Sequence, residues 1–359
     1  MTKLLRFPIY LALASALTVA VLAEPAVPAT QTESTAKCGA EDQPETGLQG
    51  QVPRQVQDAG FEGFWCNIRI VGHQNNRNRG GNHQVAWWDH CVYEGNLAVD
   101  RGDPLAGTAV IDVSNPGKPK LVRFLQTPGS LLVTESLHTA NGLLVSSDGT
   151  KLDIYDISRN CARPRLKTFI DLPFANHGAW LSYDAKTWYG LAIANEPGDV
   201  DIEVVDLTNP TKPELLLTWS STSLLPDHIE AAPGELTLGF HDMSTNKKGT
   251  RLYLATDRLG QGGGLTILDS TDIVRRRPNP ELKFVSYIDW LESPTMGGQT
   301  GGGSHTAWLA HFKGKPYILA EDEGTALLGV TCPQTSQART VDIADEENPE
   351  VVSTFQLEV

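Results

Sequence analysis

One short motif recurs five times along this chain of 359 residues and restricts its fold more than any other feature. Each copy is an apolar run that ends in Asp and continues into a turn, usually with proline, as in "VIDVSNPGKPKL" from residue 110. The anchoring acids are Asp112, Asp156, Asp206, Asp269 and Asp342, at separations of 44, 50, 63 and 73 residues. A unit of about 40 to 50 residues with later insertions indicates a repeat architecture.

The chemistry of the motif predicts a strand that ends in a tight corner. Apolar β-branched residues before the Asp favour a buried strand. The carboxylate can accept hydrogen bonds from the backbone amides of the turn that follows. Proline ends the strand because it has a fixed φ and no amide donor. The next run, such as "KLVRFLQT" or "ELLLTWSS", is then expected to return as an outer strand.

Two further strands precede each corner. Second strands are predicted at 142–148, 186–195, 249–257 and 314–322, and before each a short first strand begins near a histidine. Four-stranded units of this length, packed side by side, form a β-propeller. We therefore expect an all-β fold, a β-propeller of about six or seven four-stranded blades over residues 58–359, with 61–73 as strand material that could close the ring.

The corner segments resemble the LVIVD-repeat family of exported bacterial and archaeal propellers, over most of residues 87–359. The resemblance implies the propeller fold and export, and it implies no particular reaction, since the family is defined by its structural repeat. Two segments depart from the pattern: the one at Asp269 carries an inserted "IVRRR", and "ISRNCARP" lacks the first proline.

The N-terminal segment has the pattern of a secretory signal peptide. Lys3 and Arg6 precede an apolar stretch, and Val21-Leu22-Ala23 fits a small-residue cleavage site. An uncleaved membrane anchor is the alternative, but the run is short and no basic stop follows it. We predict a signal peptide at 1–23, a secreted or periplasmic protein, and no integral membrane segment after cleavage. Residues 24–57, rich in Pro, Gln, Thr and Glu, are expected to form a disordered linker.

The charge balance limits the partners of the mature protein. Removing residues 1–23 removes two of the 29 basic residues and none of the 43 acidic ones, which leaves a net charge of −16. Such a surface repels nucleic acid and anionic lipid and tolerates cations. The expected partner is a small molecule or a protein ligand, not nucleic acid.

The five cysteines are Cys38, Cys66, Cys91, Cys161 and Cys332. None forms a CxxC pair, which argues against a thiolate zinc site or a thioredoxin-type centre. An exported protein can form disulfides, and the odd number leaves at least one thiol that is free or pairs between chains. We predict a Cys66–Cys91 bridge, because both residues lie in the first strand-rich segment.

Histidines and acids are placed to meet at one mouth of a propeller channel. The predicted first strands begin at or near His138, His177, His241 and His305, and His90 is the candidate in the earliest unit. The loops after the second strands contribute the candidate ligand-binding residues Glu94, Asp148, Asn195, Glu196, Asp257, Glu321 and Asp322.

This pattern supports three interpretations. The first is a metal site, because neutral imidazoles suit zinc, copper or iron and carboxylates complete or orient the ligand shell. The second is acid–base chemistry on a bound small molecule without a metal. The third is repeat-wide packing. We predict an exported propeller that binds a small molecule or partner at this face, with a metal-dependent hydrolase or oxidoreductase using the same histidines as the alternative. No HExxH or GxSxG motif is present.

Overall fold

A computed structural model describes residues 37–44, 55, 58–60, 63, 65–97, 100–192, 200–224, 238–258, 262–290, 304–322 and 337–355. The chain divides into two units, residues 1–68 and 69–359. The predicted signal peptide lies outside the described residues. Among the residues that are described, no helix has the length and apolar character needed to cross a membrane.

The second unit contains five four-stranded antiparallel sheets, each formed by four strands that are consecutive in the chain. The first sheet contains β1 (Asn82–Trp88), β2 (Cys91–Asn96), β3 (Thr108–Asp112) and β4 (Lys120–Leu125). The second contains β5 (Leu137–Ala140), β6 (Leu143–Ser147), β7 (Lys151–Asp156) and β8 (Arg165–Asp171). The third contains β9 (Asn176–Leu181), β10 (Thr187–Ala192), β11 (Ile202–Asp206) and β12 (Glu214–Trp219).

The last two sheets follow the same plan. The fourth contains β13 (Leu238–Thr245), β14 (Arg251–Arg258), β15 (Gly262–Asp269) and β16 (Lys283–Asp289). The fifth contains β17 (Ser304–Phe312), β18 (Lys315–Asp322), β19 (Ala338–Asp342) and β20 (Glu350–Phe355). A short helical turn, η1 (Asn76–Asn78), precedes β1, and three others lie between strands: η2 (Pro128–Ser130), η3 (Ser221–Leu224) and α2 (Thr271–Val274).

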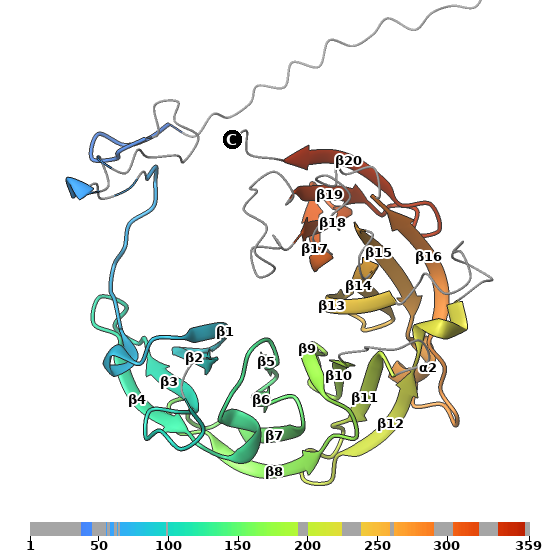
Figure 1. Ribbon diagram of the computed structural model, residues 1–359, viewed down its shortest axis with the longest axis horizontal. Helices are drawn as coiled ribbons and strands as arrows, with labels where there is room; N and C mark the ends of the chain where they lie inside the picture. Colours follow the sequence, from blue (N-terminus) through green and yellow to red (C-terminus); the bar gives the residue numbers. More distant parts are fainter. Residues whose placement is uncertain are drawn as a thin grey trace, which may run out of the picture. The chain divides into compact units, whose positions relative to one another are not determined.

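The arrangement of the sheets is that of a β-propeller type of fold. In Figure 1 the five sheets follow one another in chain order, and the first strand of each lies on the inner side of the row. The first strands of neighbouring sheets contact one another along the row, β1 with β5, β5 with β9, β9 with β13, and β13 with β17. The described residues thus contain five blades, where the sequence led us to expect six or seven. The described part of 61–73 forms no strand of a sheet, and Ile70 there is 93% exposed.

All five predicted corners are present, and each has the predicted hydrogen bond. Every anchoring Asp is the last residue of the third strand of its sheet. Its Oδ1 accepts the backbone N–H two residues ahead, from Ser114 (2.8 Å), Ser158 (3.0 Å), Thr208 (2.8 Å), Thr271 (2.7 Å) and Ala344 (2.8 Å). The turn reverses the chain into the fourth strand, which confirms the outer-strand prediction.

The hydrophobic core lies between neighbouring sheets. Middle strands are buried, as in β10, while fourth strands such as β4 are largely exposed. One cluster joins the second and third sheets around Trp188, and another joins the third and fourth sheets around Tyr189. Each blade therefore buries its faces against its neighbours, as expected for repeated units that cannot form a core alone.

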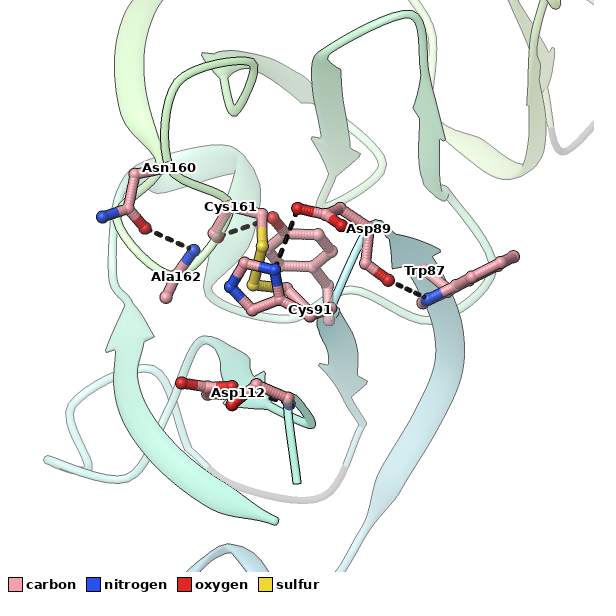
Figure 2. The surroundings of a disulfide bond; sticks show 10 residues. Trp87, Asp89, Cys91, Asp112, Asn160, Cys161 and Ala162 are labelled. Carbon is pink, nitrogen blue, oxygen red and sulfur yellow. Dashed lines mark hydrogen bonds and ion pairs between the residues drawn. A yellow bond between two sulfur atoms is a disulfide. The ribbon is translucent and has the colours of Figure 1, made fainter. Parts of the chain in front are cut away.

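The disulfides differ from the predicted pairing. Cys38 is bonded to Cys66 within the first unit, and Cys91 is bonded to Cys161 within the second, so the predicted Cys66–Cys91 bridge is wrong. Cys161 lies 70 residues from Cys91 in the chain, in the corner of the next sheet, and the packing of the two sheets brings the Cα atoms to 5.8 Å (Figure 2). Cys332 lies outside the described residues.

Part of the predicted linker is tied to the segment that follows it. The Cys38–Cys66 bond is accompanied by a hydrogen bond from the Trp65 amide to the Gln43 carbonyl, 2.8 Å long. The disulfide and the hydrogen bond both connect residues 37–44 with residues 65–67.

Candidate metal centre

One position, on the first strand of a blade or just before it, carries an imidazole or a carboxylate in every sheet. The residue of the second strand that lies opposite the corner Asp gives a common reference in every sheet, for example Thr187 opposite Asp206. The pairing of the second strand with the first leads from this reference to a residue near the end of the first strand. Moving back from there by the same number of residues in every sheet reaches one equivalent position, which we call the inner position. Its residues are His83, Glu135, His177, His241 and His305.

Irregular pairing at the inner position redirects these side chains. The ladder shifts between Asn82 and Val85 in the first sheet, and equivalent shifts flank His177, His241 and His305 in theirs. A β-bulge bends the strand and re-aims a side chain, and bulges are frequent beside functional sites. Glu135 lies just before β5 and forms an isolated parallel bridge with Gly178.

Four of the five inner residues form one cluster, which we call the inner cluster: Glu135, His177, His241 and His305. The Nε2 atoms of His177 and His241 are 3.1 Å apart. Glu135 Oε2 lies 3.5 Å from His177 Nε2 and 3.4 Å from His241 Nδ1. Glu135 Oε1 lies 3.9 Å from His305 Nε2. The cluster thus draws one side chain from each of the second to fifth blades.

Close backbone contacts between blades explain this convergence. Ser136 Oγ donates to the His177 carbonyl over 2.9 Å. Gly178 lies so near the next blade that a Cβ atom there would be 2.1 Å from the His241 carbonyl oxygen. Only glycine permits that approach, because it has no Cβ. The backbones of the second, third and fourth blades are therefore in close contact beside the inner cluster.

The protonation states in the inner cluster suit metal binding. Burial raises the pKa of Glu135, but hydrogen bonding to His305 and the nearby histidines outweigh it and lower that pKa to about 2, so the carboxylate is ionised. Burial lowers the pKa of His241 to about 4, against the opposing effect of Glu135, so its ring is neutral at pH 7. The side chains keep contact with solvent, from 20% exposed for Glu135 and His241 to 36% for His177.

Aromatic rings lie beside the cluster, three residues further along the first strands. His138, Trp180 and Trp308 occupy this next position, in three different blades. The Trp180 ring lies 5.6 Å from each of the other two, measured between ring centroids. Trp308 also donates its Nε1–H to Asp242 Oδ2 over 3.2 Å. Burial raises the pKa of Asp242 to about 6, opposed by its hydrogen bonds with Met243 and Trp308.

Three of the predicted histidines, His177, His241 and His305, are brought together, and two are not. His138 is one of the three aromatic rings beside the cluster, and its Nε2 is buried without a hydrogen-bond partner in the described structure. His90 lies in the turn between β1 and β2, with Nδ1 2.9 Å from Asp89 Oδ2. The expectation that it fills the first-strand slot is corrected: the strand begins earlier, and His83 holds that position.

The predicted acids have other partners or lie elsewhere. Asp322 forms a buried ion pair with Arg339, at 2.7 Å, and Asp148 pairs with Arg101 at 2.7 Å. Glu94 accepts a hydrogen bond from Asn76, and Glu321 is exposed on β18. Asn195, Glu196 and the Asp257 side chain lie outside the described residues.

Sequence reasoning missed the acid of the cluster, Glu135, together with His83 and Asp242. The local sequence does not separate Glu135 from His138, because the second residue after each is apolar, as in "ESL" and "HTA". The strand pairing of the second sheet is needed to place Glu135 at the position equivalent to the inner residues of the other blades. Two other His, Cys and acid groupings in the described residues both include disulfide-bonded cysteines, whereas the grouping of Glu135, His241 and His305 contains no cysteine.

Comparisons with known proteins show likeness of fold only. No protein-family model matches the chain, and no curated protein matches it. Among solved structures it is similar to a protein from Lactobacillus plantarum, at 12% identity and a TM-score of 0.49, covering 76% of this chain and 70% of that one. It is also similar to the periplasmic gluconolactonase PpgL of Pseudomonas aeruginosa, at 14% identity and a TM-score of 0.48, covering 75% of this chain and 68% of that one.

A third similar structure is a putative 6-phosphogluconolactonase from Bacteroides uniformis, at 13% identity and a TM-score of 0.48, covering 76% of this chain and 70% of that one. Identities this low do not carry an activity from one protein to another. The resemblance to the LVIVD repeat rests on the corner segments alone and stays a prediction, whereas the propeller-type architecture rests on the five sheets themselves.

Proposed function

We propose that the inner cluster binds one divalent transition-metal ion and that the protein is a metal-dependent enzyme that activates water for hydrolysis. The observation that carries the proposal is the spacing of the donor atoms. Two atoms bound to one tetrahedral zinc at about 2.0–2.1 Å are about 3.3 Å apart. Among the proposed ligands, Glu135 Oε2 lies 3.4 Å from His241 Nδ1, and Glu135 Oε1 lies 3.9 Å from His305 Nε2.

The donor set suits a catalytic site. Glu135, His241 and His305 each offer a ligand atom, and these atoms lie within 4.8 Å of one another. Two imidazoles and one carboxylate, with a fourth position left for water, are a known ligand set of catalytic zinc. Water bound to such an ion has a pKa near 7.

His177 is the most exposed member of the inner cluster, and we assign it the role of positioning His241. Its Nε2 lies 3.1 Å from His241 Nε2 and can accept the N–H of that ring, which directs His241 Nδ1 toward the ion beside Glu135. Water would take the remaining position on the ion. Trp308, half exposed, offers an apolar surface next to this position for the substrate. Export as a secreted or periplasmic protein is part of the proposal and is supported by the N-terminal pattern.

A second candidate uses the same residues with another metal. Two histidines and one carboxylate also hold non-haem iron(II) in oxygen-activating enzymes. The protein would then be an oxidoreductase. Binding of a small molecule without catalysis, the function first expected from the sequence, would also use this face.

Metal analysis tests the proposal. The mature protein, purified without a polyhistidine tag, is expected to contain about one zinc ion per chain by mass spectrometry, whereas stoichiometric iron would favour the oxidoreductase. After chelation, calorimetric titration with Zn²⁺ should show one site. Glu135→Gln and His241→Ala are each expected to weaken binding at least about tenfold, since each removes a ligand.

A matched control is available in the first blade. His83 occupies the inner position there, but its Nδ1 contacts the Thr134 carbonyl at 2.9 Å. His83→Ala should keep zinc affinity close to that of the wild type, with circular dichroism confirming that all variants fold. Zinc binding that is absent, or that survives Glu135→Gln and His241→Ala unchanged, contradicts the proposal.

A further inference from the structure

A cavity lies at the other end of the blades from the inner cluster. It has a volume of about 540 Å³ and lies between the third and fourth sheets. Its walls come from the turn between β9 and β10, the turn between β13 and β14, and the residues around α2. His177 of the inner cluster is the second residue of β9 (Asn176–Leu181), and Ser182, which follows the other end of the strand, lines this cavity, so the two sites are at opposite ends of β9.

The cavity is cationic although the chain is acidic. Lys186, Lys247, Lys248 and Arg276 line it, against the single acid Asp184, in a chain whose net charge is −14. Lys186 Nζ is 3.8 Å from Asp184 Oδ2, and both side chains are more than half exposed, so this pair is weak. Lys247 and Lys248 are exposed and form no ion pair with any described residue. Three lysines therefore remain available to an anion.

Arg276 has a different role, because its guanidinium is already occupied. It contacts Asp206 at 3.0 Å and donates to the Ile273 and Lys186 carbonyls, each over 2.6 Å. These bonds join the third and fourth sheets through the floor of the cavity. Arg276 therefore holds the walls in place and leaves the lysines to contact a ligand.

Both lysine-bearing turns are fixed by hydrogen bonds. The Gly249 amide donates to the Asn246 carbonyl over 2.8 Å, and the Thr250 amide donates to Asn246 Oδ1 over 2.9 Å, which closes the turn that carries Lys247 and Lys248. In the other turn, the Lys186 amide donates to Asp184 Oδ1 over 3.1 Å. Turns held in this way lose little conformational entropy when a ligand binds between them.

We propose that this cavity binds a small, multiply charged phosphate-bearing anion through Lys186, Lys247 and Lys248. Lysine acts as a point charge toward phosphate, and three lysines from two blades match an anion that carries several charges. The half-exposed Tyr183 ring also lines the cavity and offers an apolar face to the rest of such a ligand. This binding site does not depend on the metal site proposed above.

Calorimetric titration with tripolyphosphate in 150 mM salt tests the inference. The wild type is expected to bind one equivalent. The double variant Lys247→Gln/Lys248→Gln should bind at least about tenfold more weakly, because two of three charge-assisted contacts are lost. Lys186→Gln should give a smaller loss in the same direction.

The control changes the net charge by the same amount at distant sites. Lys118 and Lys313 are exposed in turns of the first and fifth sheets, outside the cavity. Lys118→Gln/Lys313→Gln should bind tripolyphosphate within about twofold of the wild type, since charges further away than a Debye length of about 8 Å are screened. Absence of binding to the wild type, or equal losses in both double variants, would overturn the inference.

Discussion

The Nε2 atoms of His177 and His241 lie 3.1 Å apart, although 64 residues separate them in the chain. This short distance depends on the residue beside His177. Gly178 faces the backbone of His241 so closely that no other amino acid fits without moving one blade. The position of the proposed ligand His241 beside His177 is therefore determined by a backbone contact between the third and fourth blades.

Gly178→Ala should weaken metal binding without removing a ligand. The new Cβ would lie 2.1 Å from the His241 carbonyl oxygen, so the two blades must separate. We expect at least about a tenfold loss of Zn²⁺ affinity, since misplaced ligands cost about as much as lost supporting contacts. Gly102→Ala is the control, because a Cβ at Gly102 has no neighbour within 4 Å. Equal zinc affinities in the two variants would show that the contact between Gly178 and His241 does not determine the zinc affinity of the site.

Removing the Cys91–Cys161 disulfide should destabilise the sheet unit. The bond closes a loop of 70 residues, and a crosslink of that length restricts the unfolded chain. We expect Cys91→Ala/Cys161→Ala to reduce the free energy of unfolding by about 2–5 kcal/mol in denaturant titrations. The matching pair Cys38→Ala/Cys66→Ala lies in the first unit and should leave that transition unchanged. A Cys91/Cys161 variant as stable as the wild type contradicts the expectation.

The corner acids should differ in their effect on stability. Asp206 accepts the Thr208 amide and also pairs with Arg276 from the neighbouring sheet, whereas Asp112 accepts the Ser114 amide at an exposed corner. Asp206→Asn is expected to reduce the free energy of unfolding by about 1–3 kcal/mol, because it leaves Arg276 without its counter-charge. Asp112→Asn should have a smaller effect. Denaturant titration of both variants at pH 7 provides the comparison, and a larger loss for Asp112→Asn would contradict it.

His138 should make the fold sensitive to mild acid. Burial lowers its pKa to about 4, against the opposing effect of a backbone hydrogen bond with Ala179. The unfolded chain has the ordinary histidine pKa near 6.5 and so binds more protons as the pH falls below that value. The contribution to stability is complete above pH 6.5 and is lost progressively toward pH 4, by about 2 kcal/mol between pH 7.5 and pH 5.

His138→Phe removes this titration and keeps an aromatic ring beside Trp180. The difference in unfolding free energy between the wild type and the variant should therefore shift by about 2 kcal/mol in favour of the variant when the pH falls from 7.5 to 5. Because both proteins contain the inner cluster, its titration contributes equally to the two unfolding free energies and cancels in their difference. A difference that is independent of pH would show that His138 is not held neutral by burial.

The repeat and its corners could be predicted from the sequence because their causes are local. An apolar β-branched run forms a strand, Asp accepts the amides of the next turn, and proline prevents the strand from continuing. All these interactions lie within a few residues, so "VIDVSNP" and its four relatives determine their own conformation. The same local logic placed His177, His241 and His305 near the start of a first strand, and the structure has them there.

Only the tertiary structure decided which side chains meet. The register of each first strand depends on its partner strand and on bulges, and a shift of one residue turns a side chain to the opposite face. For this reason Glu135 joins the cluster while His138 packs against Trp180, although His138 is the histidine of that strand. The Cys91–Cys161 bond likewise follows from the packing of two blades, because contacts between residues 70 positions apart are set by how the sheets associate and not by the chain near either cysteine.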